Sequence, residues 1–389
     1  MKSGLLYPAR MIKQSFKTSF SYLALLSTIA GASGAFAATK PVLKLGAVFS
    51  MSGPTASFGQ ESMDGVRMAI QEINKKADIK IDLVLEDDKS ESTDATNAIR
   101  KLINVDKVHV VVGSVPSSIT MAMAPIAQAA KIPLLSPSST NVKVTDAGDY
   151  ISRICFIDDF QGSGMAKFAF ETMKAKTAAV VIDSQQDYSK GLGSSFSDAF
   201  KKLGGKVSVE VSYQTKDQDF SSQLTKIRTR KPDIIFVPGY YGEVGNMIRQ
   251  AVAMGITTKF IGGDGWSSPI LFDLAGPAIE GNYFADHFSP DDTDPQVKGF
   301  VSKYTAKFKR TPSAMAALGY DSVYVVAEAF KKAGGKTDGE SLKNAINSTQ
   351  GYAGVTGSIT LDAKRNAHKP LVVLETKKDH GVFKTRISP

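Results

Sequence analysis

The amino-acid sequence predicts an α/β protein with two lobes, each a parallel sheet flanked by helices. From residue 43 onward, short strands of nearly continuous Val, Ile and Leu alternate with longer amphipathic segments. Such strands are typical of parallel sheets that helices cover on both faces. The length of 389 residues suggests two domains, and a hydrophobic content of 42% supplies an ample core.

The first series of elements runs to residue 137. Met63, Val66, Ile70 and Ile73 fall at helical spacing and predict a helix. In full, the series has predicted strands over 43–50, 81–88, 109–113 and 132–137, and predicted helices over 59–77, 95–106 and 118–130.

A second series of similar size begins near residue 160. It has predicted helices over 160–176, 188–204, 219–230 and 243–255, and predicted strands over 177–183, 206–213, 233–239 and 259–264. Two further helices, over 294–308 and 313–333, are expected to return to the first lobe.

Three segments are interpreted as crossings between the lobes: 153–160, 283–292 and 361–370. We therefore expect two Rossmann-like lobes with parallel sheets, joined by a three-crossing hinge. Lobe I is expected to hold 38–158 plus 288–364, and lobe II 159–287 plus 365–389. A hinged cleft of this kind closes over a small ligand.

Residues 1–37 have the pattern of a cleaved secretory signal peptide. A basic stretch precedes a short apolar run that ends in Ala35-Phe36-Ala37, an A-x-A cleavage pattern. A retained membrane anchor is less favoured, because the run is short and interrupted by glycines. The single cysteine, Cys155, excludes an intrachain disulfide and is expected to be a buried thiol. We expect a diffusible protein of the bacterial periplasm, not embedded in the membrane.

The net charge of +9 overstates the basic character of the mature chain. Residues 1–37 hold four basic residues and no acid, which leaves 43 basic against 38 acidic residues. No basic block or stripe is present, so a nucleic-acid partner is not expected.

Two clusters of small hydroxyl residues follow neighbouring predicted strands. Ser117 and Ser118 occupy the first turn of a predicted helix, whose free N–H groups favour an anion. Ser138, Ser139 and Thr140 lie in the loop after the next strand. Each cluster alone is explained by ordinary helix capping, but adjacent strand ends can together hold one carboxylate.

The second lobe supplies an acid, and aromatic rings gather at the cleft-facing ends of both lobes. Asp264 follows a strand in a glycine-rich turn, where it suits an ammonium group or bonds its own backbone. Phe58, Tyr188, Tyr240 and Tyr241 fall near the expected cleft. Singly such rings are packing residues, but as a set they form walls for an apolar side chain.

The order of these stretches resembles a known family. "SGPTASFGQESMDGVRMAIQEIN", "GSVPSSIT", "LLSPSST", "DYSKG", "PGYYGE" and "GGDGW" are similar to the periplasmic amino-acid-binding proteins of ABC importers. The similarity is closest to the leucine/isoleucine/valine-binding proteins of the type I periplasmic binding fold, and it covers about 42 to 380.

The resemblance implies a role for each candidate residue. Ser117 would bind the ligand carboxylate, and the stretch of Ser138, Ser139 and Thr140 would contact both carboxylate and ammonium. Asp264 would pair with the ammonium, and Tyr188 and Tyr240 would line the cleft. Members of this family usually act as monomers.

Three departures from the family pattern concern ligand preference. Phe58 stands where the family has a tyrosine, which removes a hydroxyl. Asp264 stands where glutamate is common among leucine binders, and Ser138 and Ser139 replace two alanines.

Enzyme signatures are absent from the sequence. It has no G-x-S-x-G elbow and no G-x-G-x-x-G after the first strand, and the "GGKT" at 334–337 follows a helix and lacks the P-loop glycine. The four histidines show no metal-ligand spacing. No catalytic residue, metal or cofactor is therefore expected.

The sequence favours the substrate-binding component of an ABC importer. Its expected partners are a free amino acid, branched-chain or hydrophobic, and an inner-membrane ABC permease. Three alternatives stay open: a binding protein for another small carboxylate, such as an aromatic acid or short amide, a sensor ectodomain with the same fold, and an exported hydrolase.

Overall fold

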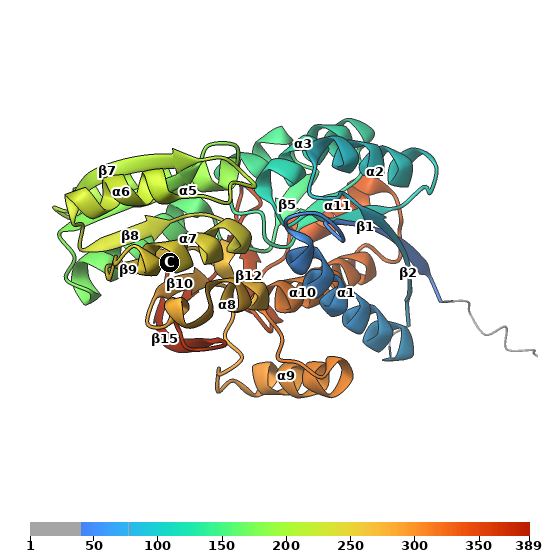
Figure 1. The fold of residues 1–389 in the computed structure, drawn as a ribbon. Coiled ribbons are helices and arrows are strands. Elements are labelled where there is room, and N and C mark those ends of the chain that lie inside the picture. Colours follow the sequence, from blue (N-terminus) through green and yellow to red (C-terminus); the bar gives the residue numbers. More distant parts are fainter. Residues whose placement is uncertain (1–39, 77) are drawn as a thin grey trace, which may run out of the picture. The chain divides into compact units, whose positions relative to one another are not determined.

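The computed structural model describes residues 40–76 and 78–389, which fold around two main sheets (Figure 1). The predicted signal peptide, residues 1–37, lies outside the described residues. Across the described part of the chain, none of the helices combines the length and apolar character that a membrane crossing needs. The α/β class predicted from the sequence is confirmed.

The first sheet is parallel throughout its described strands, in the order β2-β1-β3-β4-β5. These are β1 (Val42–Phe49), β2 (Lys80–Asp87), β3 (Val110–Gly113), β4 (Leu134–Ser136) and β5 (Ile151–Arg153). The alternating helices are α1 (Ala56–Lys76), α2 (Ser92–Asn104) and α3 (Ser117–Ala130), and a 3-10 turn covers Val142–Ala147. Strands β3, β4 and β5 are buried along their whole length, and in β3 this burial explains the unbroken run of valines.

The second sheet has the order β15-β14-β10-β9-β8-β6-β7. Its strands are β6 (Thr177–Asp183), β7 (Lys206–Tyr213), β8 (Ile234–Val237), β9 (Lys259–Gly262), β10 (Tyr283–Asp286), β14 (Leu371–Thr376) and β15 (Gly381–Ile387). Its helices are α4 (Asp158–Lys167), continued by a π turn over Phe168–Thr172, and α5 (Asp187–Lys202), α6 (Ser221–Arg230), α7 (Tyr241–Ala253) and α8 (Pro269–Ala275). Strands β14 and β15 add an antiparallel edge that the sequence analysis did not predict.

The parallel parts of the two sheets have the same strand order. In the first sheet the initial strand β1 lies between the second and third strands, and in the second sheet β6 lies between β7 and β8 in the same way. Open α/β sheets bind ligands beyond the carboxyl ends of their strands, where the strand order reverses. Those points lie between β1 and β3 and between β6 and β8.

Three helices and a small sheet follow β10. They are α9 (Pro295–Phe308), α10 (Ala314–Lys332) and α11 (Gly339–Asn347), then β11 (Tyr352–Gly354), β12 (Gly357–Leu361) and β13 (Ala367–His368). Helix α10 packs beside α1 (Figure 1), and a Cβ at Gly65 would lie 1.9 Å from the Ala316 carbonyl oxygen. The chain thus returns to the first series of elements after β10. The exact lobe boundaries given above stay a prediction.

Candidate ligand-binding site

A cavity lies where the strand ends of the two sheets approach each other. The residues that line it are Phe58, Val115, Ser117, Ser138, Tyr188, Tyr240, Asp264, Gly265 and Met315. Six of the ten residues singled out in the sequence are therefore brought to one place, and the four that do not line it are Ser118, Ser139, Thr140 and Tyr241.

The wall from the first sheet offers hydroxyls and a helix end. Ser117 begins α3, and Pro116 before it provides no side-chain acceptor for the first N–H groups of the helix. The Ser117 hydroxyl accepts a hydrogen bond from the Asn141 backbone N–H at 3.2 Å. The Ser138 hydroxyl is buried and has no hydrogen-bond partner. An unpaired hydroxyl beside an uncapped helix N-terminus suits an anionic ligand group.

Ser139 and Thr140 differ from each other in their bonding. The Ser139 hydroxyl donates to the backbone carbonyl of Val115 at 2.9 Å and lies 2.7 Å from the Thr120 hydroxyl, so it holds the β3–α3 loop in place. The Thr140 hydroxyl is buried without a partner. The Thr140 carbonyl accepts from the Asp158 N–H at 2.9 Å.

The wall from the second sheet carries a buried acid that already has partners. Asp264 follows β9, and its Oδ1 accepts from Gln161 Nε2 at 2.9 Å. Its Oδ2 lies 3.1 Å from His287 Nε2. Its backbone N–H donates to Gln161 Oε1 at 2.9 Å. The preceding Gly263 allows this close approach, because a Cβ there would lie 2.2 Å from Gln161 Oε1 and 2.5 Å from the Tyr188 hydroxyl.

Aromatic rings form the rest of this wall. Tyr188 and Tyr240 stack with ring centroids 5.2 Å apart and planes inclined by 4°. Phe58, which belongs to α1 and therefore to the first wall, packs edge-on against Tyr240 with ring centroids 5.7 Å apart. The Tyr188 hydroxyl accepts from the Gly265 N–H at 2.9 Å. Burial raises the pKa of both tyrosines well above the usual range, so both hydroxyls stay neutral.

The structure adds residues near the site that the sequence analysis did not name. Asp158 is buried and neither of its carboxyl oxygens has a hydrogen-bond partner. Burial raises its pKa well above the usual range, and the Thr140 hydroxyl partly offsets that rise although no regular hydrogen bond joins the two groups. Gln161 and His287 hold Asp264. Asp158 follows β5 and His287 follows β10. Both would have been candidates as residues beyond strand ends if these segments had been identified as strands.

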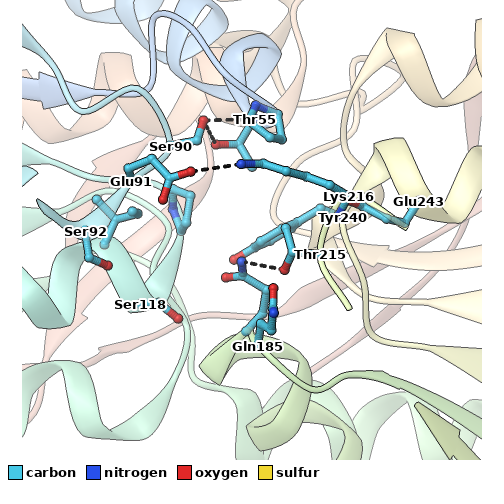
Figure 2. A pocket seen from close by; sticks show the side chains of 14 residues that line it. Thr55, Ser90, Glu91, Ser92, Ser118, Gln185, Thr215, Lys216, Tyr240 and Glu243 are labelled. Atoms are coloured by element: carbon cyan, nitrogen blue, oxygen red, sulfur yellow. Dashed lines mark hydrogen bonds and ion pairs between the residues drawn. The ribbon is translucent and has the colours of Figure 1, made fainter. Parts of the chain in front are cut away.

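A larger, open cavity adjoins the first and shares Tyr240 with it. Figure 2 shows Glu91 and Lys216 reaching toward each other across this space, and their charged atoms are 2.9 Å apart. Ser118 and Asp187 also join the two sides, because the Ser118 hydroxyl donates to Asp187 Oδ2 at 3.1 Å and accepts from the Asp187 N–H at 3.0 Å. We call this space the cavity mouth, because it is open and borders the smaller cavity at Tyr240.

The described residues contain no cluster of His, Cys, Asp and Glu that could hold a metal ion. Cys155 is buried, as expected from the sequence, and burial raises its thiol pKa to about 12. A thiol in this state is a poor nucleophile and a poor metal ligand.

The fold and the cavity define a class of two-sheet binding proteins that enclose a small ligand. The sequence profile of the periplasmic binding protein family matches residues 42–381, and the chain belongs to this family.

Curated relatives include the leucine-specific-binding protein of Salmonella typhimurium, 32% identical over 294 residues, which cover 75% of this chain and 79% of the relative. A second is the leucine-, isoleucine-, valine-, threonine- and alanine-binding protein of Pseudomonas aeruginosa, 30% identical over 327 residues, which cover 83% and 86%.

Solved structures give the same result. The leucine-binding protein LivK of Thermotoga maritima superimposes with a TM-score of 0.86 and 38% identity, over 89% of this chain and 99% of that one. A solute-binding protein of R. palustris in complex with benzoate has a TM-score of 0.83 and 25% identity, over 90% and 97%. The type I periplasmic binding fold predicted from the sequence is thereby confirmed.

Proposed function

We propose that this chain is the periplasmic substrate-binding component of an ABC importer, and that it captures a free amino acid with a branched or other apolar side chain. One observation carries the proposal: opposite walls of one buried cavity offer complementary groups to a zwitterion. The first wall has the unpaired Ser138 hydroxyl, the Ser117 hydroxyl and a helix N-terminus, and the second has a carboxylate among aromatic rings.

Each part of the ligand then has a partner. The ligand carboxylate would lie against Ser117, Ser138 and the first turn of α3, where N–H groups and hydroxyls satisfy it. The ammonium would face Asp264. An apolar side chain would pack against Phe58 and the two stacked tyrosines, which offer large apolar surfaces. Binding needs no covalent step, so the serines act as ligand holders.

Capture proceeds by hinge closure in this proposal. The two predicted lobes would close about the three crossing segments, 153–160, 283–292 and 361–370. Only a ligand that touches both walls stabilises the closed arrangement, because a shift in population requires a difference in affinity between the two states. The hydrogen bonds between Ser118 and Asp187 join the predicted lobes and would add to that stability.

The cellular setting follows from the same proposal. Residues 1–37 would direct export and be removed, and the mature chain would act as a monomer that delivers its ligand to an inner-membrane permease. The names of the relatives from Salmonella and Pseudomonas support leucine, isoleucine and valine as first ligands to test.

A second candidate ligand class is an aromatic carboxylate. The similarity to the benzoate-bound protein of R. palustris favours it, as do the rings of Phe58, Tyr188 and Tyr240. Asp264 argues against this class, because a ligand without an amine would leave a buried acid facing another carboxylate.

A thermal-shift screen of the refolded, ligand-stripped chain separates these candidates. A ligand at about 100 times its dissociation constant stabilises the protein by about 2.7 kcal/mol, which moves the melting temperature visibly. We expect shifts with leucine, isoleucine or valine. Shifts with benzoates alone would replace the amino-acid proposal by the second candidate.

A further inference from the structure

The two carboxylate oxygens of Asp264 each have a neutral side chain as a hydrogen-bond partner. Gln161 belongs to α4 and donates to Oδ1, whereas His287 follows β10 and lies at hydrogen-bond distance from Oδ2. Gln161 also accepts from the Asp264 N–H, so it grips both the backbone and the side chain. Because the two partners come from different elements, the carboxylate has little freedom to rotate.

The surroundings of His287 determine which ring nitrogen carries the proton. The side chain is completely buried, and its ring stacks on Phe156 with centroids 3.7 Å apart. Nδ1 has no hydrogen-bond partner, whereas Nε2 faces a carboxylate oxygen. The neutral tautomer with hydrogen on Nε2 therefore fits, and the contact is a hydrogen bond rather than an ion pair.

Burial keeps His287 neutral at ordinary pH. It lowers the pKa of the imidazole to about 4, although the Asp264 carboxylate acts in the opposite direction. A lysine or arginine in this place would neutralise Asp264. Two neutral donors instead orient the carboxylate and leave its negative charge available on the side of the cavity.

We propose that Gln161 and His287 are positioning residues that aim the charge of Asp264 at the ligand ammonium and thereby make the site selective for ligands with an amine. This inference rests on the proposed function. It assigns the selectivity to a three-residue unit rather than to Asp264 alone. It also accounts for a histidine that is deeply buried yet has a single polar partner for its ring.

The test compares His287→Ala with His287→Gln, since the glutamine amide can replace the Nε2–H donor and does not titrate. Leucine binding is measured by titration calorimetry at pH 7 with the ligand-stripped chain. We expect His287→Ala to weaken leucine binding at least about tenfold, and His287→Gln to stay within about threefold of the wild type. Gln161→Met, which removes the other donor at similar volume, is expected to act like His287→Ala.

Two controls separate positioning from a general structural effect. The first is 4-methylpentanoate, which has the side chain and carboxylate of leucine but no amine. Its affinity, measured at ligand concentrations high enough to detect weak binding, is expected to be equal in the wild type and in His287→Ala. The second is His109→Ala, at the other end of the first sheet, where the imidazole accepts from the Lys44 N–H. It is expected to bind leucine as the wild type does.

Different results would overturn the positioning role and the proposed function. Equal leucine affinity in His287→Ala and wild type, or failure of His287→Gln to restore binding, would overturn the positioning role and leave the proposed function intact. An equal loss of affinity for leucine and for 4-methylpentanoate in His287→Ala would also overturn the positioning role and leave the proposed function intact. Absence of amino-acid binding by the wild type would overturn the proposed function, and this inference with it.

Discussion

The two sheets share one strand order but differ in the chemistry at equivalent strand ends. The loop after β4 carries Ser138, and the loop after the equivalent strand β9 carries Asp264. The third strands lead to Ser117 and to Tyr240. The serine side chains at the strand ends of the first sheet are small, and the Ser138 hydroxyl has no hydrogen-bond partner. The Tyr240 and Asp264 side chains at the strand ends of the second sheet are larger, and the Asp264 carboxylate already has two hydrogen-bond partners. The same topology therefore forms two different walls. We call the side with Ser117 and Ser138 the receptive wall and the side with Tyr240 and Asp264 the preorganised wall.

This difference gives each wall a separate role in recognition. Unpaired buried hydroxyls are costly until a ligand satisfies them, so the first wall gains most when the ligand carboxylate arrives. A carboxylate fixed by two donors needs no rearrangement, so the second wall selects for charge and position. Substitutions on the two walls should therefore change ligand affinity and protein stability by different amounts.

The largest effect is expected at the preorganised wall. Asp264→Ala removes the charge that faces the ammonium, and truncating one partner of a buried charge pair costs about 2–5 kcal/mol. Leucine affinity should fall by at least about thirtyfold, measured by titration calorimetry. Asp273→Ala, an exposed acid of α8, is the matched control and should bind normally. Retention of full affinity in Asp264→Ala would remove the acid from the site.

A pair of serine variants tests the receptive wall. Ser117→Ala should lower leucine affinity by about 1.5–3 kcal/mol, because it removes a hydrogen bond to a charged ligand group. Ser139→Ala should instead lower the free energy of unfolding by about 1–3 kcal/mol, since its hydroxyl holds the β3–α3 loop. Calorimetry and urea melts measure the two quantities. The reverse pattern would mean that the roles of the two serines have been exchanged.

Asp158 offers a test of stability without ligand. Burial raises its pKa, so the folded chain holds this proton more tightly than the unfolded chain does. Its stabilising contribution is complete below the unfolded pKa of about 4 and is lost as the pH rises toward the folded value. Asp158→Asn should therefore raise the free energy of unfolding by about 1–2 kcal/mol at pH 7, and by less near pH 4.

Urea melts of ligand-free protein at both pH values measure that difference. Asp159→Asn, the exposed neighbour, should change stability little at either pH. A clear loss of stability in Asp158→Asn at pH 7 would show that the carboxylate is ionised and paired in the folded chain.

The smallest effect is expected at the cavity mouth. The Glu91–Lys216 ion pair is more than half exposed on both sides, and exposed pairs contribute about 0–1 kcal/mol. Lys216→Ala should weaken leucine binding by less than about fivefold, and the loss should shrink in high salt. Repeating the titration at low and high salt checks this expectation. A large, salt-independent loss would give the mouth a greater role than the account allows.

The sequence predicted the elements that have a strong period or composition. The helices expected over 294–308 and 313–333 differ by one residue at most from α9 and α10 at each end. Ser117, Ser138 and Asp264 were also expected to lie together, because the carboxyl ends of parallel strands meet at the same edge of a sheet. In the structure all three line one cavity.

What the sequence did not predict has identifiable causes. Strands β5, with the sequence ISR, and β10, with the sequence YFAD, lack the run of Val, Ile and Leu that identified other short strands, and their segments were interpreted as crossings. Asp158 and His287 follow these strands and were missed for that reason. Whether a hydroxyl is paired, as in Ser139, or unpaired, as in Ser138, depends on loop geometry that residue type does not encode.

The central claim is that one cavity recognises both charges of a free amino acid. The most direct test is a calorimetric titration of the ligand-stripped mature chain with leucine, followed by 4-methylpentanoate and benzoate. The account predicts saturable one-to-one binding of leucine and binding of the two amine-free carboxylates at least about a hundredfold weaker, in line with the loss of a buried charge pair. Equal or tighter binding of the amine-free carboxylates would contradict it.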